Sequence, residues 1–259
     1  TAVSGAGLRV SREDGIARIV FDRPAVLNAL SPKLLISLIE VCGELAEDER
    51  VRVVRMEGAG PCFSAGADLP AFLAELGGED AHAIADLGRR AVEAVAALPQ
   101  ISVAGARGHC VGGGLVLAGA CDIRIAADDV RFLIPELDAG IPLGWGGMAH
   151  LIRLVGETVA ADWVLSCRPF GAEEALRAGL ISRVVPASEL GEALQELCGA
   201  IRAKPASVLR ATKRQLRSIR AGHFDPRDDA KALLAALRDP EATQKGMEYV
   251  KGRIQRGSG

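Results

Sequence analysis

Alternating apolar and polar positions predict β-strands along the first half of the chain. Residues 8–10 and 16–21 alternate in this way, and Asp14-Gly15 between them is typical of a tight hairpin turn. Three later apolar runs have the length and composition of further strands: 51–56, 101–104 and 122–126. The sequence therefore predicts a hairpin followed by three separate strands.

Helical periodicity separates these strands. Ser31-Pro32 places an N-cap residue before a proline in the first helical turn, and leucines and isoleucines then recur at helical spacing. A second predicted helix covers 79–98 and ends before Pro99, and a short one covers 115–120. This alternation continues to residue 185 and predicts an α/β domain with a largely parallel sheet.

The pattern changes beyond residue 186. From there the apolar positions recur at helical spacing, interrupted by prolines, and the predicted helices are 187–203, 206–221, 228–237 and 241–253. We therefore expect two parts, an α/β core over residues 1–186 and a helical C-terminal module over residues 187–259.

The composition of the 259 residues restricts the class of protein. The chain is 49% hydrophobic, which excludes a disordered chain, and its formal net charge of −2 with only 3% aromatic residues argues against a nucleic-acid-binding surface. No uncharged apolar run reaches the roughly 18 residues needed to span a membrane, and the start of the chain has no signal-peptide pattern. We expect a cytoplasmic protein that binds neither nucleic acid nor membrane.

Several common chemistries are missing from the sequence. The six cysteines form no C-x-x-C pair and none stands at metal-ligand spacing with the four histidines, so we expect reduced thiols and no metal site. There is no phosphate-binding loop, no H-E-x-x-H and no G-x-S-x-G. The triple glycine 112–114 does not fit the dinucleotide-binding pattern, because Leu117 stands in place of the last glycine.

Two turns rich in small residues follow neighbouring predicted strands. In the first, 63–69, Asp68 can cap the next helix while the backbone N–H groups around Ala67 stay free. In the second, 108–114, glycines lead into the start of a helix, where the dipole favours negative charge. Together the turns predict a two-donor site for an oxyanion. The alternative is that their glycines only permit tight packing.

Glu136 is the candidate acid–base group. It follows the apolar residues 132–134 and Pro135, so we expect it at the end of a strand with little hydration. Burial raises the pKa of a carboxyl group and suits it to proton transfer near neutral pH. A solvated loop acid is the alternative, and the spacing alone leaves both open.

Taken together, these residues resemble a known family. The run 106–122, ARGHCVGGGLVLAGACD, is similar to the signature of the enoyl-CoA hydratase/isomerase (crotonase) superfamily. Further segments resemble the family in the family's order: 23–30, 63–68, 135–147, 153–156, 175–179, 184–186 and 211–213. The resemblance spans nearly the whole chain.

The resemblance implies a crotonase-like spiral of repeated ββα units with a helical C-terminal trimerisation module, and therefore a homotrimer or a dimer of trimers. It implies an acyl-CoA substrate, with no cofactor beyond the CoA of that substrate. In this resemblance the catalytic groups are Glu136 and the two backbone donors of Ala67 and Gly113. The implied substrate-binding residues are Ala25, Ala65, Gly66, Asp68, Leu69, Gly112, Val116 and Trp145. Lys213 and residues 249–253 are weaker candidates for contacts with the nucleotide or a neighbouring subunit.

One position departs from the pattern of the family's hydratases. Those enzymes carry one glutamate two residues after the triple glycine and another twenty residues later, whereas this chain has Val116 and Glu136. Addition of water needs two groups, and valine provides neither proton transfer nor water binding. The further acid of some relatives is also missing, because its position is Gly144.

We therefore expect double-bond isomerisation by a single base rather than hydration. The alternatives are a non-catalytic acyl-CoA-binding protein and residual enoyl-CoA hydratase activity in fatty-acid breakdown. A serine hydrolase on a related fold is a weaker alternative, because no Ser/His/Asp set stands out.

Overall fold

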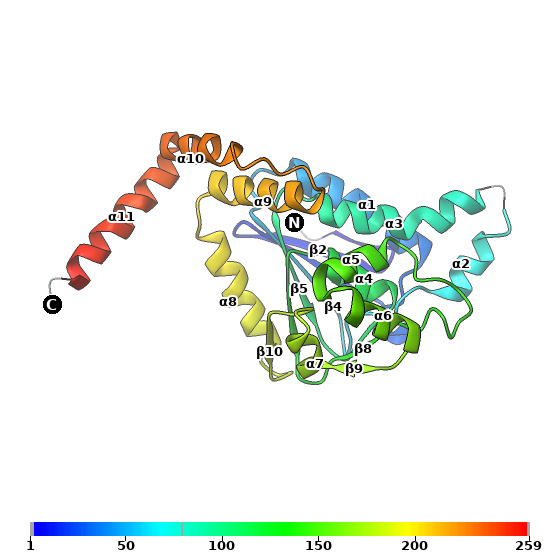
Figure 1. Ribbon diagram of the computed structural model, residues 1–259. Helices are drawn as coiled ribbons and strands as arrows, with labels where there is room; N and C mark the ends of the chain where they lie inside the picture. The colour runs from blue at the N-terminus through cyan, green and yellow to red at the C-terminus, as the bar shows by residue number, and fades with distance from the viewer. Residues whose placement is uncertain (1–2, 79, 258–259) are drawn as a thin grey trace.

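The computed structural model describes residues 3–78 and 80–257 and is built around a seven-stranded sheet (Figure 1). Its order is β1-β2-β3-β4-β5-β7-β10. The first three strands pair antiparallel and the remaining pairs are parallel. The strands are β1 (Val3–Gly5), β2 (Leu8–Glu13), β3 (Ile16–Phe21), β4 (Val53–Gly58), β5 (Ile101–Ala106), β7 (Ile123–Ala127) and β10 (Arg183–Val185).

A smaller sheet stands beside the carboxyl ends of β4 and β5. It has the order β6-β8-β9, with β6 parallel to β8 and β8 antiparallel to β9. The strands are β6 (His109–Val111), β8 (Arg131–Leu133) and β9 (Phe170–Gly171). This sheet joins the segment after β5 to the segment that leads to Glu136.

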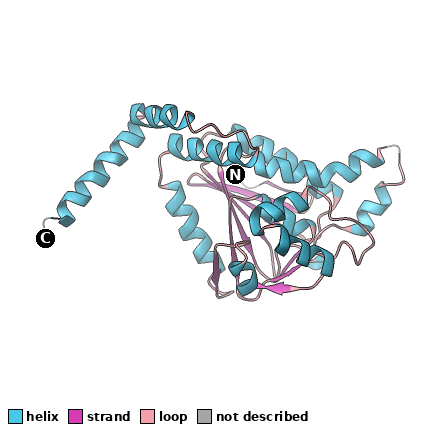
Figure 2. Cartoon of the chain, viewed as in Figure 1, coloured by secondary structure: helices cyan, strands magenta, loops and turns pink. Residues whose placement is uncertain are grey.

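Helices cover both faces of the large sheet (Figure 2). The helical elements up to residue 177 are η1 (Pro24–Val26), α1 (Pro32–Glu47), α2 (Leu69–Glu75), α3 (Ala81–Ala97), α4 (Gly113–Ala120), α5 (Gly147–Val155), α6 (Glu157–Ser166) and α7 (Ala172–Arg177). The helices after it are α8 (Leu190–Arg202), α9 (Ala206–Arg220), α10 (Asp228–Arg238) and α11 (Pro240–Gly257).

The two faces of β4 show why both sides of the sheet are covered. Val54 and Met56 belong to the main core with α1, α3 and α4, whereas Val53 packs with Leu194 and Cys198 of α8 on the other face. Successive side chains of a strand point to opposite faces, so a strand with apolar side chains on both faces needs helices to cover both. The charged exceptions in β4, Arg55 and Glu57, are buried and pair with each other at 2.8 Å.

The local predictions from sequence are confirmed with small shifts. β2 and β3 form the predicted hairpin around Asp14-Gly15, and the Ser31 hydroxyl accepts a hydrogen bond of 3.3 Å from Leu34 N at the start of α1. The strand predicted at 51–56 lies two residues later as β4. The helix predicted from residue 79 begins at Ala81 after the N-cap residue Asp80, and residue 79 lies outside the described residues.

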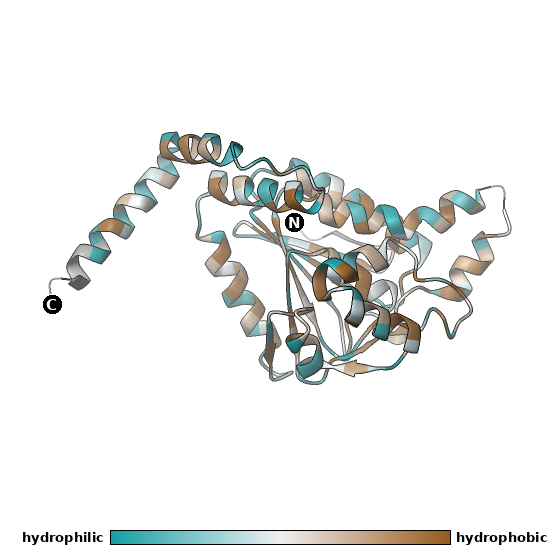
Figure 3. Ribbon diagram, in the orientation of Figure 1, coloured by the Kyte–Doolittle hydropathy of each residue, from teal (hydrophilic) through white to brown (hydrophobic). Residues whose placement is uncertain are grey.

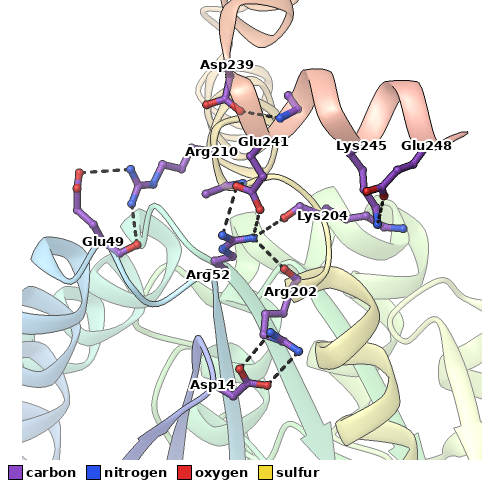
Figure 4. A network of polar contacts seen from close by, with 12 residues as sticks. Asp14, Glu49, Arg52, Arg202, Lys204, Arg210, Asp239, Glu241, Lys245 and Glu248 are labelled. Atoms are coloured by element: carbon purple, nitrogen blue, oxygen red, sulfur yellow. Dashed lines mark hydrogen bonds and ion pairs between the residues drawn. The ribbon is translucent and has the colours of Figure 1, made fainter.

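Figure 4 shows how the last helices are attached to the body of the protein. Arg52 Nη1 donates to Glu241 Oε1 at 2.7 Å and to the carbonyls of Lys204 and Arg202 at 3.0 and 3.2 Å. The other oxygen of Glu241 accepts a hydrogen bond from Ala206 N at 3.1 Å, at the start of α9. One carboxylate therefore connects the beginning of α11 to α9 and to the edge of β4.

α10 lies along α9, and α11 extends away from the sheet (Figure 1). Hydrophobic residues occur along both helices (Figure 3). Their exposed apolar residues are Leu233, Leu234, Leu237, Met247, Tyr249 and Val250. Within the described ranges, no helix has both the length and the apolar character to cross a membrane. The boundary predicted at residue 186 stays a prediction, as does the module 187–259, whose last two residues lie outside the described ranges.

Candidate active site

The two predicted turns lie side by side at the carboxyl ends of β4 and β5. Hydrogen bonds join them directly: Ser64 N donates to His109 O at 2.9 Å, and Val111 N donates to Ser64 O at 3.0 Å. At Gly66, whose φ is +92°, an added Cβ would stand 2.9 Å from Val111 O and 3.8 Å from Gly113 N. Only glycine combines that backbone conformation with so close an approach.

The amides of Ala67 and Gly113 are the two candidate donors. Within residues 3–78 and 80–257, neither N–H has a hydrogen-bond acceptor in the protein. Gly113 begins α4, so its N–H precedes the first intrahelical acceptor and stands at the positive end of the helix dipole. The expected pair of donors is therefore brought together by the fold, and both are free to bind an oxygen atom.

Two buried polar side chains that sequence reasoning missed hold the first turn in place. Asn28 Nδ2 donates to the carbonyls of Ala59 and Cys62, both at 2.9 Å. The Ser64 hydroxyl donates to Asn28 O at 2.8 Å and accepts from Gly66 N at 3.1 Å. Both side chains are completely buried. The available signal was a polar residue inside each of two segments, 23–30 and 63–68, that already carried the family resemblance.

Asp68 has structural partners for both carboxylate oxygens. Its Oδ1 accepts a hydrogen bond of 3.3 Å from Ala71 N, which confirms the predicted cap of α2, and its Oδ2 pairs with Arg23 Nη1 at 2.9 Å. These contacts fix the entry into α2. The predicted contact of Asp68 with substrate stays a prediction.

The remaining residues expected along the CoA channel lie around the same turn. Ala25 is exposed in η1, and Leu69 is the first residue of α2 and is also exposed. The half-buried Ala65 donates its N–H to Leu27 O at 2.9 Å, which ties the segment after η1 to the turn. Their contacts with CoA stay predictions.

Glu136 lies against the second turn. An added Cβ on Gly112, whose φ is +49°, would stand 2.5 Å from Glu136 Oε1. The segment is positioned by β8, because Gly112 N donates to Leu133 O at 2.9 Å. Among the described residues Oε2 is buried without a hydrogen-bond partner, and burial raises the pKa of Glu136 above its ordinary value. The expectation of a poorly hydrated carboxyl group is confirmed.

Val116 occupies the next turn of α4. It is 2% exposed, and its Cγ2 is 2.7 Å from the position that a Cβ of Gly147 would take. Its side chain therefore packs against the start of α5. At this position the side chain offers methyl groups and no group that transfers a proton.

Trp145 forms a wall next to one of the donors. Its indole lies over Gly113 and over Gly88 of α3, so closely that an added Cβ at either glycine would overlap the ring. The ring centroid is 6.3 Å from that of Phe72 in α2. The indole is half-buried and bridges α2, α3 and α4 beside the free amide of Gly113.

Comparison with known proteins identifies a family for this chain. The sequence model of one family, Enoyl-CoA hydratase/isomerase, matches residues 11–251. A short-chain-enoyl-CoA hydratase of Clostridium acetobutylicum is 33% identical over 208 residues, which cover 80% of this chain and 79% of that protein. A probable enoyl-CoA hydratase of Mycobacterium avium is 39% identical over 183 residues, which cover 71% of this chain and 70% of that protein.

Solved structures show the same fold over nearly the full length. An enoyl-CoA hydratase/carnithine racemase from Magnetospirillum magneticum has a TM-score of 0.89 at 27% identity, covering 96% of this chain and 94% of that one. A putative enoyl-CoA hydratase from Thermobifida fusca, in complex with acetoacetyl-CoA, has a TM-score of 0.82 at 31% identity. The match covers 90% of this chain and 95% of that one. The expected crotonase fold is confirmed, and the chain belongs to the enoyl-CoA hydratase/isomerase family.

Proposed function

We propose that this chain is an enzyme that acts on an acyl-CoA thioester. The observation that carries the proposal is the placement of two free amides, of Ala67 and Gly113, beside one buried carboxyl group, Glu136. The amides bind the thioester oxygen, and Glu136 transfers a proton at the carbons next to it. Support comes from the similar Thermobifida fusca protein, whose structure contains acetoacetyl-CoA.

Double-bond isomerisation is the reaction that a single base can complete. Glu136 removes a proton from C2 of a 3-enoyl-CoA, and the electron pair of that bond enters a dienolate whose negative charge lies largely on the thioester oxygen. Glu136 then returns the proton to C4, which gives the 2-enoyl-CoA. Proton and electrons balance within the substrate, so the proposed reaction needs no cofactor beyond the CoA it carries.

Hydration is the second candidate, because the similar proteins from Clostridium acetobutylicum and Mycobacterium avium are named hydratases. Adding water across a double bond requires one group that activates the water and one that delivers a proton. Val116 supplies neither function and is itself packed against the start of α5. We therefore rank isomerisation above hydration, with a non-catalytic acyl-CoA-binding protein as the third alternative.

Replacing Val116 by glutamate tests this ranking. The unmodified chain is expected to isomerise 3-enoyl-CoA and to hydrate 2-enoyl-CoA slowly, and Val116→Glu is expected to raise hydration by about tenfold or more by adding the missing carboxylate. Mass spectrometry of an acyl-CoA panel measures both reactions. Val116→Gln, which has similar size but no base, is the matched control and should gain no hydration.

Two outcomes of that panel contradict the proposal in different ways. Efficient hydration by the unmodified chain contradicts the assignment of isomerisation while keeping the acyl-CoA substrate. Saturable acyl-CoA binding with no turnover of any substrate favours the binding protein instead. Circular dichroism of each variant separates lost chemistry from lost folding, since residue 116 is buried.

The pH dependence of turnover tests the assignment of Glu136 as the base. Only the carboxylate form accepts a proton, so activity is present above its pKa and declines as the pH falls through it. Because burial raises the pKa of Glu136 above 4.5, the acidic limb of kcat/KM is expected to have its midpoint above pH 4.5. A profile that stays flat to below this pH contradicts the assignment.

We also propose that the chain forms a homotrimer or a dimer of trimers. α10 and α11 expose apolar side chains, among them Leu233, Leu237 and Tyr249. These side chains support association, because contact between chains removes their apolar surface from water. The expected mass in solution is therefore that of three or six chains, and light scattering measures it.

A further inference from the structure

A buried group of charges lies between α9, β5 and the start of β7. The Asp122 carboxylate is 3% exposed and accepts hydrogen bonds from Lys213 Nζ at 2.6 Å and from Ser102 N at 2.8 Å. Arg220 Nη1 stands 3.0 Å from its other oxygen. Asp122 is therefore already shared between two cations, Lys213 and Arg220.

On the outer side of this group, α3, α5 and α9 enclose an open cleft of about 570 Å³. Three arginines and a histidine line it together with one carboxylate: Arg153, Arg217, Arg220, His150 and Glu93. The other lining residues are alanines and Gly146, whose small side chains leave the space between the helices open. The volume falls in the range of small-molecule sites, about 300–1,000 Å³.

The positive charges that line the cleft outnumber the negative charges of its lining residues. Glu93, the carboxylate among its described lining residues, is 63% exposed and already pairs with Arg89 Nη1 at 2.6 Å. Burial and the nearby guanidinium of Arg153 lower the pKa of His150, so the ring is neutral at pH 7. Burial and Arg220 also lower the pKa of Arg153, as expected for two cations facing each other.

We propose that this cleft between α3, α5 and α9 binds a small anionic molecule through a phosphate or pyrophosphate group. Guanidinium groups present forked N–H donors that match phosphate oxygens, and a bound dianion relieves the repulsion among Arg153, Arg217 and Arg220. None of the residues lining this cleft is among those named for the proposed acyl-CoA site, so the two sites are distinct.

Calorimetric titration of the full chain with pyrophosphate at low ionic strength tests the proposal. We expect saturable binding that weakens by about tenfold or more in Arg153→Ala and in Arg217→Ala, since each removes a charge-assisted contact. Arg214→Ala is the matched control. Arg214 carries the same charge on the same helix but faces α10 rather than the cleft, so affinity should be retained.

Four results overturn the proposal. The unmodified chain fails to bind pyrophosphate, or Arg214→Ala weakens binding as much as Arg217→Ala, which indicates unspecific attraction. CoA displaces pyrophosphate competitively, which assigns the phosphate contacts to the substrate's own nucleotide. Lastly, the unmodified chain does not bind pyrophosphate, and light scattering shows that the double variant Arg153→Glu/Arg217→Glu dissociates into single chains. That combination identifies the cleft as a contact between copies of the chain. Arg217→Ala is expected to retain turnover of acyl-CoA. A loss of pyrophosphate binding in this variant therefore tests the cleft and not the proposed function.

Discussion

Replacing Glu136 by glutamine is expected to abolish isomerisation of 3-enoyl-CoA while acyl-CoA binding persists. The substituted amide keeps the size of the side chain beside Gly112 but cannot accept a proton, whereas the donors of Ala67 and Gly113 remain in place. Loss of a general base typically costs about 10²–10⁴ in rate. Steady-state kinetics give kcat, and calorimetry with a non-reactive acyl-CoA gives the dissociation constant.

A nearby carboxylate provides the control for this experiment. Asp138 is exposed two residues further along, so Asp138→Asn removes the same charge from the same loop and should leave kcat almost unchanged. If Glu136→Gln retains turnover, another group carries the proton. If both variants lose activity equally, the loop rather than the base is responsible.

Lys213→Met is expected to cause the largest loss of stability. The lysine ammonium is 1% exposed and 2.6 Å from Asp122, which is 3% exposed, so its removal leaves a buried carboxylate with Arg220 as its remaining cationic partner. Breaking a buried pair in this way costs about 3–5 kcal/mol. Urea unfolding followed by circular dichroism measures the change.

The effect has a pH signature. Burial alone raises the pKa of Asp122, but the Lys213 ammonium, the Ser102 N–H and the Arg220 guanidinium together outweigh it, so the pKa lies below the ordinary value of 3.8. A lowered carboxyl pKa contributes stability that is present above the unfolded pKa and is lost as the pH falls through the folded one. The difference in the free energy of unfolding between the unmodified chain and Lys213→Met should therefore become smaller at acidic pH.

Lys231→Met is the matched control, because Lys231 pairs with Asp228 at 2.8 Å on the surface of α10 and is 81% exposed. Exposed pairs contribute little, so no measurable change is expected. Equal losses in the two variants contradict the proposed importance of burial. In Lys213→Met, a second change, Asp122→Asn, should restore part of the stability by removing the buried carboxylate that has lost its lysine partner.

Much of the fold was predictable because it depends on neighbours in the chain. The turn at Asp14-Gly15, the cap at Ser31 and the cap at Asp68 each involve residues within four positions of one another, and all three are confirmed. The helices α5, α6 and α7 were not predicted individually. They are short, at 9, 10 and 6 residues, and each begins after a glycine rather than after a side chain that caps the helix.

The candidate site was predictable in part. The glycines of the two turns and the position of Glu136 were identified from spacing and from the family resemblance. Asn28 and Ser64 were not, since a polar side chain in an apolar segment reveals nothing of its partners until the chain is folded.

The sequence by itself determined the local elements, the residue types in the turns and the family of this protein. Only the tertiary structure decided that Gly66 approaches Gly113, that Gly112 meets Glu136, and that Lys213 is buried against Asp122. The last pair is 91 residues apart in the chain. Periodicity reports which side of a helix or strand is apolar, whereas such contacts depend on how whole elements pack, and that packing is a property of the complete fold.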